Sequence, residues 1–427
     1  MNQFAELGVN ARTVAALERA GITIPVQVQA ETIQAAIAGQ DVVIEAPTGS
    51  GKSLAFLLPM IERLKNNPNP MPRALIVCPT RELAMQIDAV IGTLSPGLRR
   101  LAVFGGVGYG QQTGGLRRGT DVVIGTPGRL LDLANRGLLR LGRVEYLVLD
   151  EADEMLDSGF APDVERIMGK ISAKPQTILA SATMPEWINK MISAHLTDPH
   201  RVKVAPAEEV KLEHGLMRLQ SKDRKLEALS TLLHASEGAT ITFGRTKHGV
   251  AKLTKDLARL GHSPQELHGN MNQNQRQRAL AAFRNDPAGV LVATNVAARG
   301  LDISSVDLII NYDLPETPQW LTHRVGRTAR NGAEGRALTF LSPEDHDAWR
   351  KLRRLGAPDL PEVDTRALLL ENQWHLRPAT PLPAGQPAQS QRPHGFGNRR
   401  FQGRGAASGP RRGSYGGRPT TGPATSS

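Results

Sequence analysis

A glycine-bearing turn between two apolar runs constrains this chain more than any other segment, Ala46-Pro47-Thr48-Gly49-Ser50-Gly51-Lys52-Ser53. Residues 42–44 before it predict a buried strand, and the apolar residues from 54 onward predict a helix. A strand, such a turn and then Lys-Ser at a helix start is typical of a phosphate-binding loop. Without side chains, the glycines let the backbone N–H groups come close to the phosphates. Lys52 supplies positive charge, and the Ser53 hydroxyl is a ligand for Mg²⁺.

This loop has a simpler alternative interpretation, an ordinary connection between a strand and a helix. Ala46 stands where the general pattern has glycine, so the surrounding sequence has to support the nucleotide hypothesis. On that hypothesis, the residues of the loop that contact the nucleotide are Ala46, Thr48, Gly49, Ser50, Gly51, Lys52 and Ser53.

A carboxylate is the next requirement, because Mg²⁺ must be held and a water molecule polarised. Residues 146–149 form an apolar run that ends at Asp150 and Glu151. The carboxyl ends of parallel strands are the edge at which such sheets bind ligands. We therefore expect Asp150 to hold Mg²⁺, partly through water, and Glu151 to orient or activate the attacking water. The alternative is an acidic helix N-terminus, which the helix dipole favours by itself.

The distribution of apolar residues predicts two α/β domains. Residues 4–40 have a helical pattern, after which short apolar runs alternate with helical stretches. The strands expected in the first domain are residues 42–45, 74–78, 101–104, 122–124, 146–149 and 177–180. Those expected in the second are residues 240–243, 290–293, 308–311 and 337–341. We predict an N-terminal domain over residues 1–205, a linker over 206–212, a C-terminal domain over 213–360 and an extension over 361–427.

The net charge of +11 indicates a polyanionic partner. Residues 376–427 contain eight Arg and no Asp, Glu or Lys, and are rich in Gly, Pro, Gln and Ser, so we expect disorder from about residue 378. Arg with interspersed Gly, Phe401 and Tyr415 favours contact with nucleic acid over a merely solubilising tail.

Cys78 is the single cysteine, which excludes an intrachain disulfide and a Cys-rich metal site. We expect a cytoplasmic protein without a membrane segment, because no signal peptide or long apolar run is apparent.

Several short motifs resemble those of the DEAD-box RNA helicases, superfamily 2 enzymes of the bacterial type. The box that names the family is Asp150-Glu151-Ala152-Asp153. Others occur in the family's order over roughly four fifths of the chain, namely Pro79-Thr80-Arg81-Glu82-Leu83, Gly105-Gly106, Thr126-Pro127-Gly128-Arg129, Ser181-Ala182-Thr183, His268-Gly269, Gln273 with Arg276, Ala293-Thr294, Arg299-Gly300-Leu301-Asp302 and His323-Arg324-Val325-Gly326-Arg327-Thr328-Ala329-Arg330.

The resemblance implies two RecA-like domains that close over ATP and Mg²⁺ and grip single-stranded RNA across both. Gln29 resembles the glutamine that reads adenine, and Asp302 the aspartate that contacts ribose. Arg327 and Arg330 resemble arginine fingers. The catalytic set that the resemblance implies comprises these two residues with Lys52, Asp150, Glu151 and His323. His323 resembles the residue that links the state of the γ-phosphate to RNA binding.

On the RNA side, the resemblance implies contacts to phosphate groups that carry no sequence information. The residues concerned are Pro79, Thr80, Arg81, Gly105, Gly106, Thr126, Gly128 and Arg129 in domain one, and Gly269, Gln273, Arg276 and Thr294 in domain two. The expected activity is RNA-stimulated ATP hydrolysis with local separation of short RNA duplexes or remodelling of RNA–protein complexes. The oligomeric state and the particular RNA stay open.

The chain departs from the family pattern at Ile22, where an aromatic residue usually stacks on adenine, and at Asn295, where Asp is usual. Two alternatives remain. One is a nucleotide-gated RNA clamp or annealing chaperone in which the basic tail dominates. The other is a DNA-directed helicase built on the same core.

Overall fold

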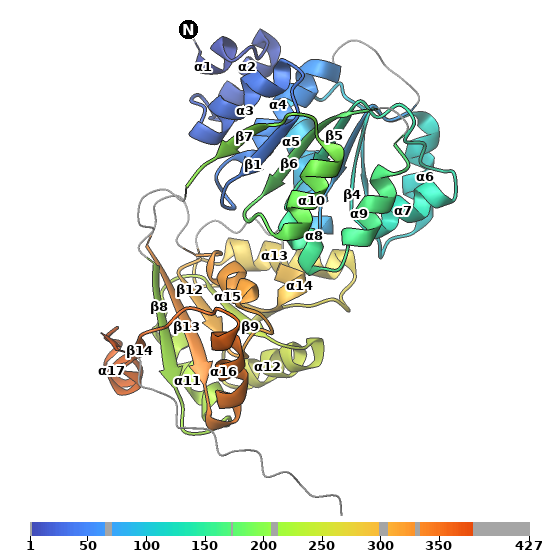
Figure 1. Cartoon of the computed structure of the whole chain (residues 1–427). Helices are drawn as coiled ribbons and strands as arrows, with labels where there is room; N and C mark the ends of the chain where they lie inside the picture. The colour runs from blue at the N-terminus through green and yellow to red at the C-terminus, as the bar shows by residue number, and fades with distance from the viewer. Residues whose placement is uncertain are drawn as a thin grey trace, which may run out of the picture. The chain divides into compact units, whose positions relative to one another are not determined.

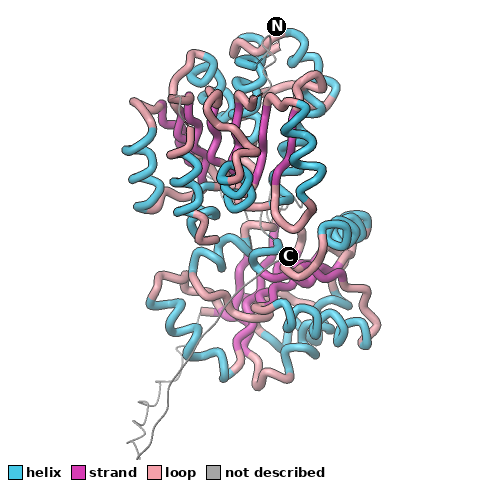
Figure 2. The backbone as a smooth tube through the Cα atoms, turned by 90° about the vertical axis from the view of Figure 1, so that its right-hand side faces the viewer, coloured by secondary structure: helices cyan, strands magenta, loops and turns pink. Residues whose placement is uncertain are grey.

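The computed structural model describes residues 2–64, 71–171, 174–205, 212–298, 306–328 and 334–378, and these form two parallel sheets with helices on both faces (Figures 1 and 2). The first sheet has the strand order β3-β4-β2-β5-β6-β1-β7, and every pairing is parallel. Its strands are β1 (Val42–Glu45), β2 (Ala74–Val77), β3 (Arg100–Val103), β4 (Val122–Gly125), β5 (Tyr146–Leu149), β6 (Gln176–Ser181) and β7 (His200–Lys203).

Successive side chains of these strands enter two different cores. Val42 and Ile44 of β1 pack into one hydrophobic cluster, whereas Val43 between them packs into the other. This alternation follows from the two-residue period of a strand, and both faces are apolar because helices cover both. The helices of this domain are α1 (Gln3–Glu6), α2 (Ala11–Arg19), α3 (Gln27–Ile37), α4 (Lys52–Leu64), α5 (Arg81–Leu94), α6 (Tyr109–Arg118), α7 (Pro127–Asn135), α8 (Ala152–Asp157), α9 (Ala161–Met168) and α10 (Glu186–His195).

The second sheet has the order β10-β11-β9-β12-β13-β8-β14-β15, in which only β15 is antiparallel to its neighbour. Its strands are β8 (Leu212–Arg218), β9 (Thr240–Gly244), β10 (Gln265–Leu267), β11 (Val290–Thr294), β12 (Leu308–Asn311), β13 (Gly335–Leu341), β14 (Glu362–Val363) and β15 (Leu376–Arg377). The helices are α11 (Arg224–Ala235), α12 (Lys247–Arg259), α13 (Gln273–Asn285), α14 (Asn295–Ala298), α15 (Pro318–Val325), η1 (Pro343–Asp345), α16 (His346–Arg354) and α17 (Thr365–Glu371).

The predicted α/β architecture is confirmed, and each predicted strand lies within one or two residues of an observed one. Five strands were missed, among them β7 and β8. Strand β7 is an edge strand with only Val202 buried, and it pairs with β1 inside a region where the apolar pattern lapses. Strand β8 begins at Leu212, inside the predicted linker.

The C-terminal part of the sheet was missed for a related reason. The two-residue strands β14 and β15 are too short to show any periodicity in the sequence. The predicted disordered tail lies almost entirely outside the described residues, which end at Pro378. None of the helices in the described part of the chain combines the length and apolarity that crossing a bilayer requires.

Candidate functional site

The phosphate loop lies at the carboxyl end of β1 and leads into α4, as its sequence predicts. Gly49 and Gly51 have φ angles of +83° and +92°, a region that side chains other than glycine rarely adopt. The buried Lys52 ammonium donates hydrogen bonds to the carbonyl oxygens of Ala46 and Pro47, 3.1 Å away in the second case. Burial lowers the pKa of Lys52, although four surrounding carboxylates oppose this. The ammonium therefore lies inside the loop, where phosphate would replace carbonyl oxygens as its partner.

Gln29, on the first turn of α3, is attached to this loop. Its side-chain amide donates to the Gly51 carbonyl over 3.2 Å and accepts from the Val26 N–H over 3.1 Å, and only 4% of the residue is exposed. A Cβ atom at Gly51 would lie 2.7 Å from the Gln29 amide nitrogen. The close approach of α3 to the loop thus requires glycine at position 51. Ile22, the departure from the family pattern, is partly buried against the adjacent core.

The carboxylates of Asp150 and Glu151 follow β5 and lie in a strongly desolvated environment. Burial raises the pKa of Asp150 to about 6. Burial, with the charges of Glu154 and Asp150 adding to it, raises the pKa of Glu151 to about 8. Glu151 has a left-handed backbone with φ +49°, and its Oε2 atom has no hydrogen-bond partner among the described residues. Such an arrangement favours the approach of a cation and a polar ligand.

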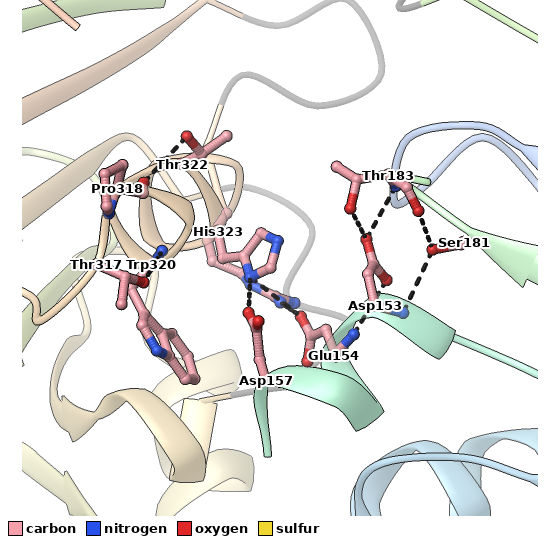
Figure 3. Close-up of polar contacts among 11 residues, drawn as sticks. Asp153, Glu154, Asp157, Ser181, Thr183, Thr317, Pro318, Trp320, Thr322 and His323 are labelled. Atoms are coloured by element: carbon pink, nitrogen blue, oxygen red, sulfur yellow. Dashed lines mark hydrogen bonds and ion pairs between the residues drawn. The ribbon is translucent and has the colours of Figure 1, made fainter. Parts of the chain in front are cut away.

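Asp153 connects the acidic box to β6 (Figure 3). The Thr183 N–H and hydroxyl both donate to Asp153 Oδ2 over 2.9 Å, and the Asp153 N–H donates to the Ser181 hydroxyl over 3.3 Å. The Ser181 hydroxyl in turn donates to the Thr183 carbonyl over 2.7 Å. The Ser-Ala-Thr segment therefore fixes the position of the acidic box from the neighbouring strand.

Helix α15 of the second domain brings His323 to the acidic residues of α8 (Figure 3). Arg327 follows two residues after the end of this helix. His323 Nδ1 lies 4.0 Å from Glu154 Oε1 and 3.9 Å from Asp157 Oδ2. The Arg327 guanidinium lies 3.5 Å from Glu154 Oε1. Both side chains line a pocket of about 390 Å³ together with the phosphate loop, Glu151 and Thr183. One cavity thus combines the loop, the acidic box and a cation from the second sheet.

Most residues predicted to bind RNA surround a second pocket, of about 640 Å³. Those that line it are Pro79, Thr80, Arg81, Gly105, Thr126, Gly128, Arg129, Gly269 and Arg276. Gly106, Gln273 and Thr294 are not among its lining residues. Gly106 instead leaves room for the Arg81 side chain, because a Cβ atom at position 106 would lie 2.3 Å from the Arg81 guanidinium.

Two residues predicted to bind RNA have partners in the other domain. Arg276, only 6% exposed, forms an ion pair of 2.7 Å with Glu82 and donates to the Ala297 carbonyl over 3.1 Å. The Gln273 amide lies 3.8 Å from the Met85 sulfur. These contacts join α13 to α5, a role that the sequence patterns do not predict.

Sequence reasoning also missed Glu154 and Asp157, because acidic residues on a short helix resemble ordinary solvated groups. Asn295, where the family usually has Asp, accepts a 2.6 Å hydrogen bond from Arg324. Burial lowers the pKa of Arg324 to about 9. Asp302 and Arg330 lie outside the described residues.

A divalent cation fits the polar groups beside the loop. Among the described residues, no three His, Cys, Asp or Glu side chains are arranged to hold a metal ion by themselves. Mg²⁺ bound with a nucleotide needs only one or two protein ligands, because phosphates and waters supply the others. The buried Asp150 carboxylate and the Ser53 hydroxyl offer a donor set of this kind.

Comparisons with known proteins agree with this geometry. Residues 26–191 match the DEAD/DEAH box helicase family and residues 224–332 match the helicase conserved C-terminal domain. The chain is 39% identical over 372 residues to the DEAD-box ATP-dependent RNA helicase CshA of Bacillus licheniformis, which covers 84% of this chain and 76% of that protein. This chain belongs to the DEAD-box helicase family.

Two further relatives and one solved structure are similar to the chain over most of its length. The ATP-dependent RNA helicase CshA of Listeria monocytogenes is 41% identical over 350 residues, covering 81% of this chain and 67% of that protein. The chain spans about half the length of the maize chloroplastic DEAD-box ATP-dependent RNA helicase 3A, with 42% identity. The structure of S. cerevisiae Dbp5 bound to RNA and ADP BeF3 superposes with a TM-score of 0.74 and 26% identity, covering 86% of this chain and 97% of that one. The two sheets of this DEAD-box core are therefore RecA-like domains.

Proposed function

We propose that this chain is an RNA-stimulated ATPase that uses ATP hydrolysis to separate short RNA duplexes locally or to remodel RNA–protein complexes. The observation that carries the proposal is the composition of the 390 Å³ pocket. Lys52 and Glu151 come from the first domain, and Arg327 from the second. An active site divided in this way is complete only when both domains contribute to it.

Each functional residue has a proposed task, both those that line this pocket, such as Lys52, Glu151 and Arg327, and those that do not. Lys52 binds the terminal phosphates, and Ser53 and Asp150 hold Mg²⁺, Asp150 partly through water. Mg²⁺, when bound, neutralises charge that develops on the phosphates. Glu151 orients or activates the attacking water, and Arg327 stabilises the charge of the transition state. Gln29 reads adenine, since an amide can donate and accept at once, and Asp302 and Arg330 complete the set.

The 640 Å³ pocket supplies the proposed RNA site. Its hydroxyl, backbone N–H and guanidinium groups suit phosphate oxygens and do not select a base. Arg276 and Gly269 reach this pocket from the second domain, so RNA and ATP both favour the same arrangement of the domains.

We further propose the domain boundaries 1–205 and 213–360, with residues 206–212 as linker, and a cytoplasmic location.

The test is steady-state ATP hydrolysis without nucleic acid, with single-stranded RNA, and with DNA of the same sequence. Stimulation by RNA, at least tenfold above that by DNA, is the expected result. Equal stimulation by DNA would favour the DNA-directed alternative. ATP binding without stimulation by either would contradict coupled hydrolysis and favour the RNA clamp or annealing chaperone, for which the arginine-rich tail is the relevant sequence feature.

A further inference from the structure

An aromatic and basic cluster lies at the 640 Å³ pocket, and two of its members, Tyr109 and Arg136, belong to none of the sequence motifs. Tyr109 is the first residue of α6, and the helices α6 and α7 are both labelled in Figure 1. The Tyr109 ring is close to the guanidinium groups of Arg129, in α7, and Arg136, which directly follows α7. The Cζ atom of Arg129 lies 4.3 Å from the ring centroid and that of Arg136 lies 4.7 Å from it. Tyr109 is 38% exposed, so this cluster is at the protein surface.

Hydrogen bonds fix the geometry of the cluster. The Tyr109 hydroxyl donates to Asp132 Oδ2 over 2.8 Å, and Arg136 Nε donates to Asp132 Oδ1 over 2.7 Å. The Arg136 NH2 group also lies 3.3 Å from the Tyr109 hydroxyl. The hydrogen bonds from Tyr109 and Arg136 lower the pKa of Asp132, so this carboxylate stays ionised and keeps accepting both.

Arg129 and Arg136 occupy different positions relative to the pocket. Arg129, Asp132 and Tyr109 line it, whereas Arg136 does not. Arg136 directly follows the last residue of α7, and its side chain is 56% exposed. The hydrogen bonds that Arg136 makes within the described residues run through its Nε and NH2 groups.

The ion pair between Asp132 and Arg136 adds little to protein stability. An exposed ion pair four residues apart on a helix contributes only about 0.3–0.5 kcal/mol. Holding a long arginine side chain in one rotamer costs entropy of a similar or larger size. A cation ordered in advance, next to a pocket of phosphate-binding groups, is instead suited to bind a further phosphate, because the planar guanidinium matches phosphate geometry.

We propose that Arg136 binds the phosphodiester backbone of the RNA strand where it leaves the 640 Å³ pocket, and that Tyr109 is the residue that positions Arg136. This inference rests on the proposed RNA-dependent function. Tyr109 acts through the arginines, since its ring contacts both guanidinium groups. The sequence does not indicate this role of Arg136, because Arg136 and Asp132 have the spacing of an ordinary ion pair on a helix surface.

The first measurement is the affinity of the full chain for single-stranded RNA at several salt concentrations, with a non-hydrolysable ATP analogue present. Each phosphate contact on a single strand contributes about 0.7 to the slope of log affinity against log salt. Arg136→Gln should reduce this slope by about 0.7 and weaken binding about fivefold near 0.1 M salt. Arg12→Gln is the matched control, because it removes the same charge from an exposed position on α2 that is not part of the pocket. Its slope should equal that of the wild type.

Two variants of Tyr109 test the positioning role. Tyr109→Phe keeps the ring and should retain most of the slope, whereas Tyr109→Leu should lower it at least as much as Arg136→Gln. Adding Arg136→Gln to Tyr109→Leu should then change the slope little further. Fully additive losses would overturn the positioning role.

The outcome also separates this inference from the proposed function. If RNA does not stimulate the wild type, the proposed function itself fails. If the wild type is stimulated but Arg136→Gln keeps the slope of Arg12→Gln, only the role of Arg136 is refuted. A correctly folded Arg136→Gln variant should keep its maximal ATPase rate at saturating RNA, because Arg136 does not line the nucleotide pocket.

Discussion

At the scale of single residues, Glu151 shows how the acidic box departs from ordinary packing. It combines a left-handed backbone, which costs roughly 1–3 kcal/mol for a residue other than glycine, with a buried carboxylate oxygen that lacks a partner in the described residues. Neither feature stabilises the fold. Glu151 instead lines the pocket that Lys52 and Arg327 also line, where an unpartnered carboxylate oxygen is available for a ligand.

Replacing this carboxylate tests its role in hydrolysis. Glu151→Gln should leave ATP affinity within a few fold of the wild type and slow RNA-stimulated hydrolysis by about 10²–10⁴, the usual contribution of a general base. The amide keeps the size of the side chain but cannot accept a proton from water. Affinity is read by nucleotide titration and turnover by phosphate release. Glu186→Gln, at the exposed start of α10, is the control, and a turnover within threefold of that control would remove Glu151 from the catalytic set.

The residues of the site differed in how far the sequence could predict them. Lys52, Asp150 and Glu151 were predictable because each directly follows an apolar strand or a glycine turn. Glu154 and Tyr109 were not, because their partners are 173 and 27 residues away, Arg327 and Arg136 respectively. The partner of Arg276 was likewise hidden, since a buried ion pair with Glu82 depends on how α13 packs and not on local spacing.

At the scale of elements, strands with a nearly continuous apolar run were predictable, whereas strands in which polar residues or glycine interrupt the apolar pattern were not. Strand β8 illustrates the difference, because it contains His214 and Gly215 and pairs with β13 along seven residues. Val363 of β14 packs where a Cβ on Gly215 would stand, 2.2 Å from the Val363 Cγ2 atom. A glycine that weakens a strand in the sequence pattern is here the condition for docking the next strand.

His214 makes the stability of the second domain dependent on pH. Burial lowers the pKa of His214 from 6.5 to about 4, and its Nε2 atom lies 2.9 Å from the Thr339 hydroxyl, which already accepts from Asn311. The unfolded chain therefore takes up the proton first as the pH falls. The stabilisation from neutral His214 is complete above pH 6.5 and is lost between pH 6.5 and 4, by roughly 1–3 kcal/mol.

The measurement is the urea midpoint of unfolding at pH 7.5 and at pH 5. His214→Gln should show a smaller decrease between these two conditions than the wild type, because glutamine does not titrate. His195→Gln, at an exposed position, should behave like the wild type. Identical decreases in all three proteins would mean that His214 does not carry this pH dependence.

At the scale of the whole molecule, the two RecA-like domains are joined by polar contacts between motifs. Arg276 pairs with Glu82 at one pocket and Arg327 with Glu154 at the other. On the proposed function, a nucleotide in the smaller pocket would offer Arg327 a second anionic partner. Exchange of Glu154 for a phosphate would therefore couple the arrangement of the domains to the state of the nucleotide.

Arg327→Ala tests this coupling. ATP binding should stay within a few fold of the wild type, because the phosphate loop belongs to the first domain, while hydrolysis at saturating RNA should fall at least 10²-fold. Arg336→Ala, which removes an exposed arginine of β13, is the control. Hydrolysis by Arg327→Ala that matches this control would exclude an arginine finger at position 327.

The position of β6 between β1 and β5 also limits how this chain can change during evolution. Ser181 ends β6 beside Glu45 of β1, and its hydroxyl faces Asp153 and Thr183. Because alternate residues of a strand face opposite sides, gaining or losing one residue in β6 would turn Ser181 away from Asp153. Aliphatic residues within β6 can be exchanged for one another, but their number cannot change. Alignments of homologous sequences should therefore show substitutions but no insertions or deletions across residues 176–181.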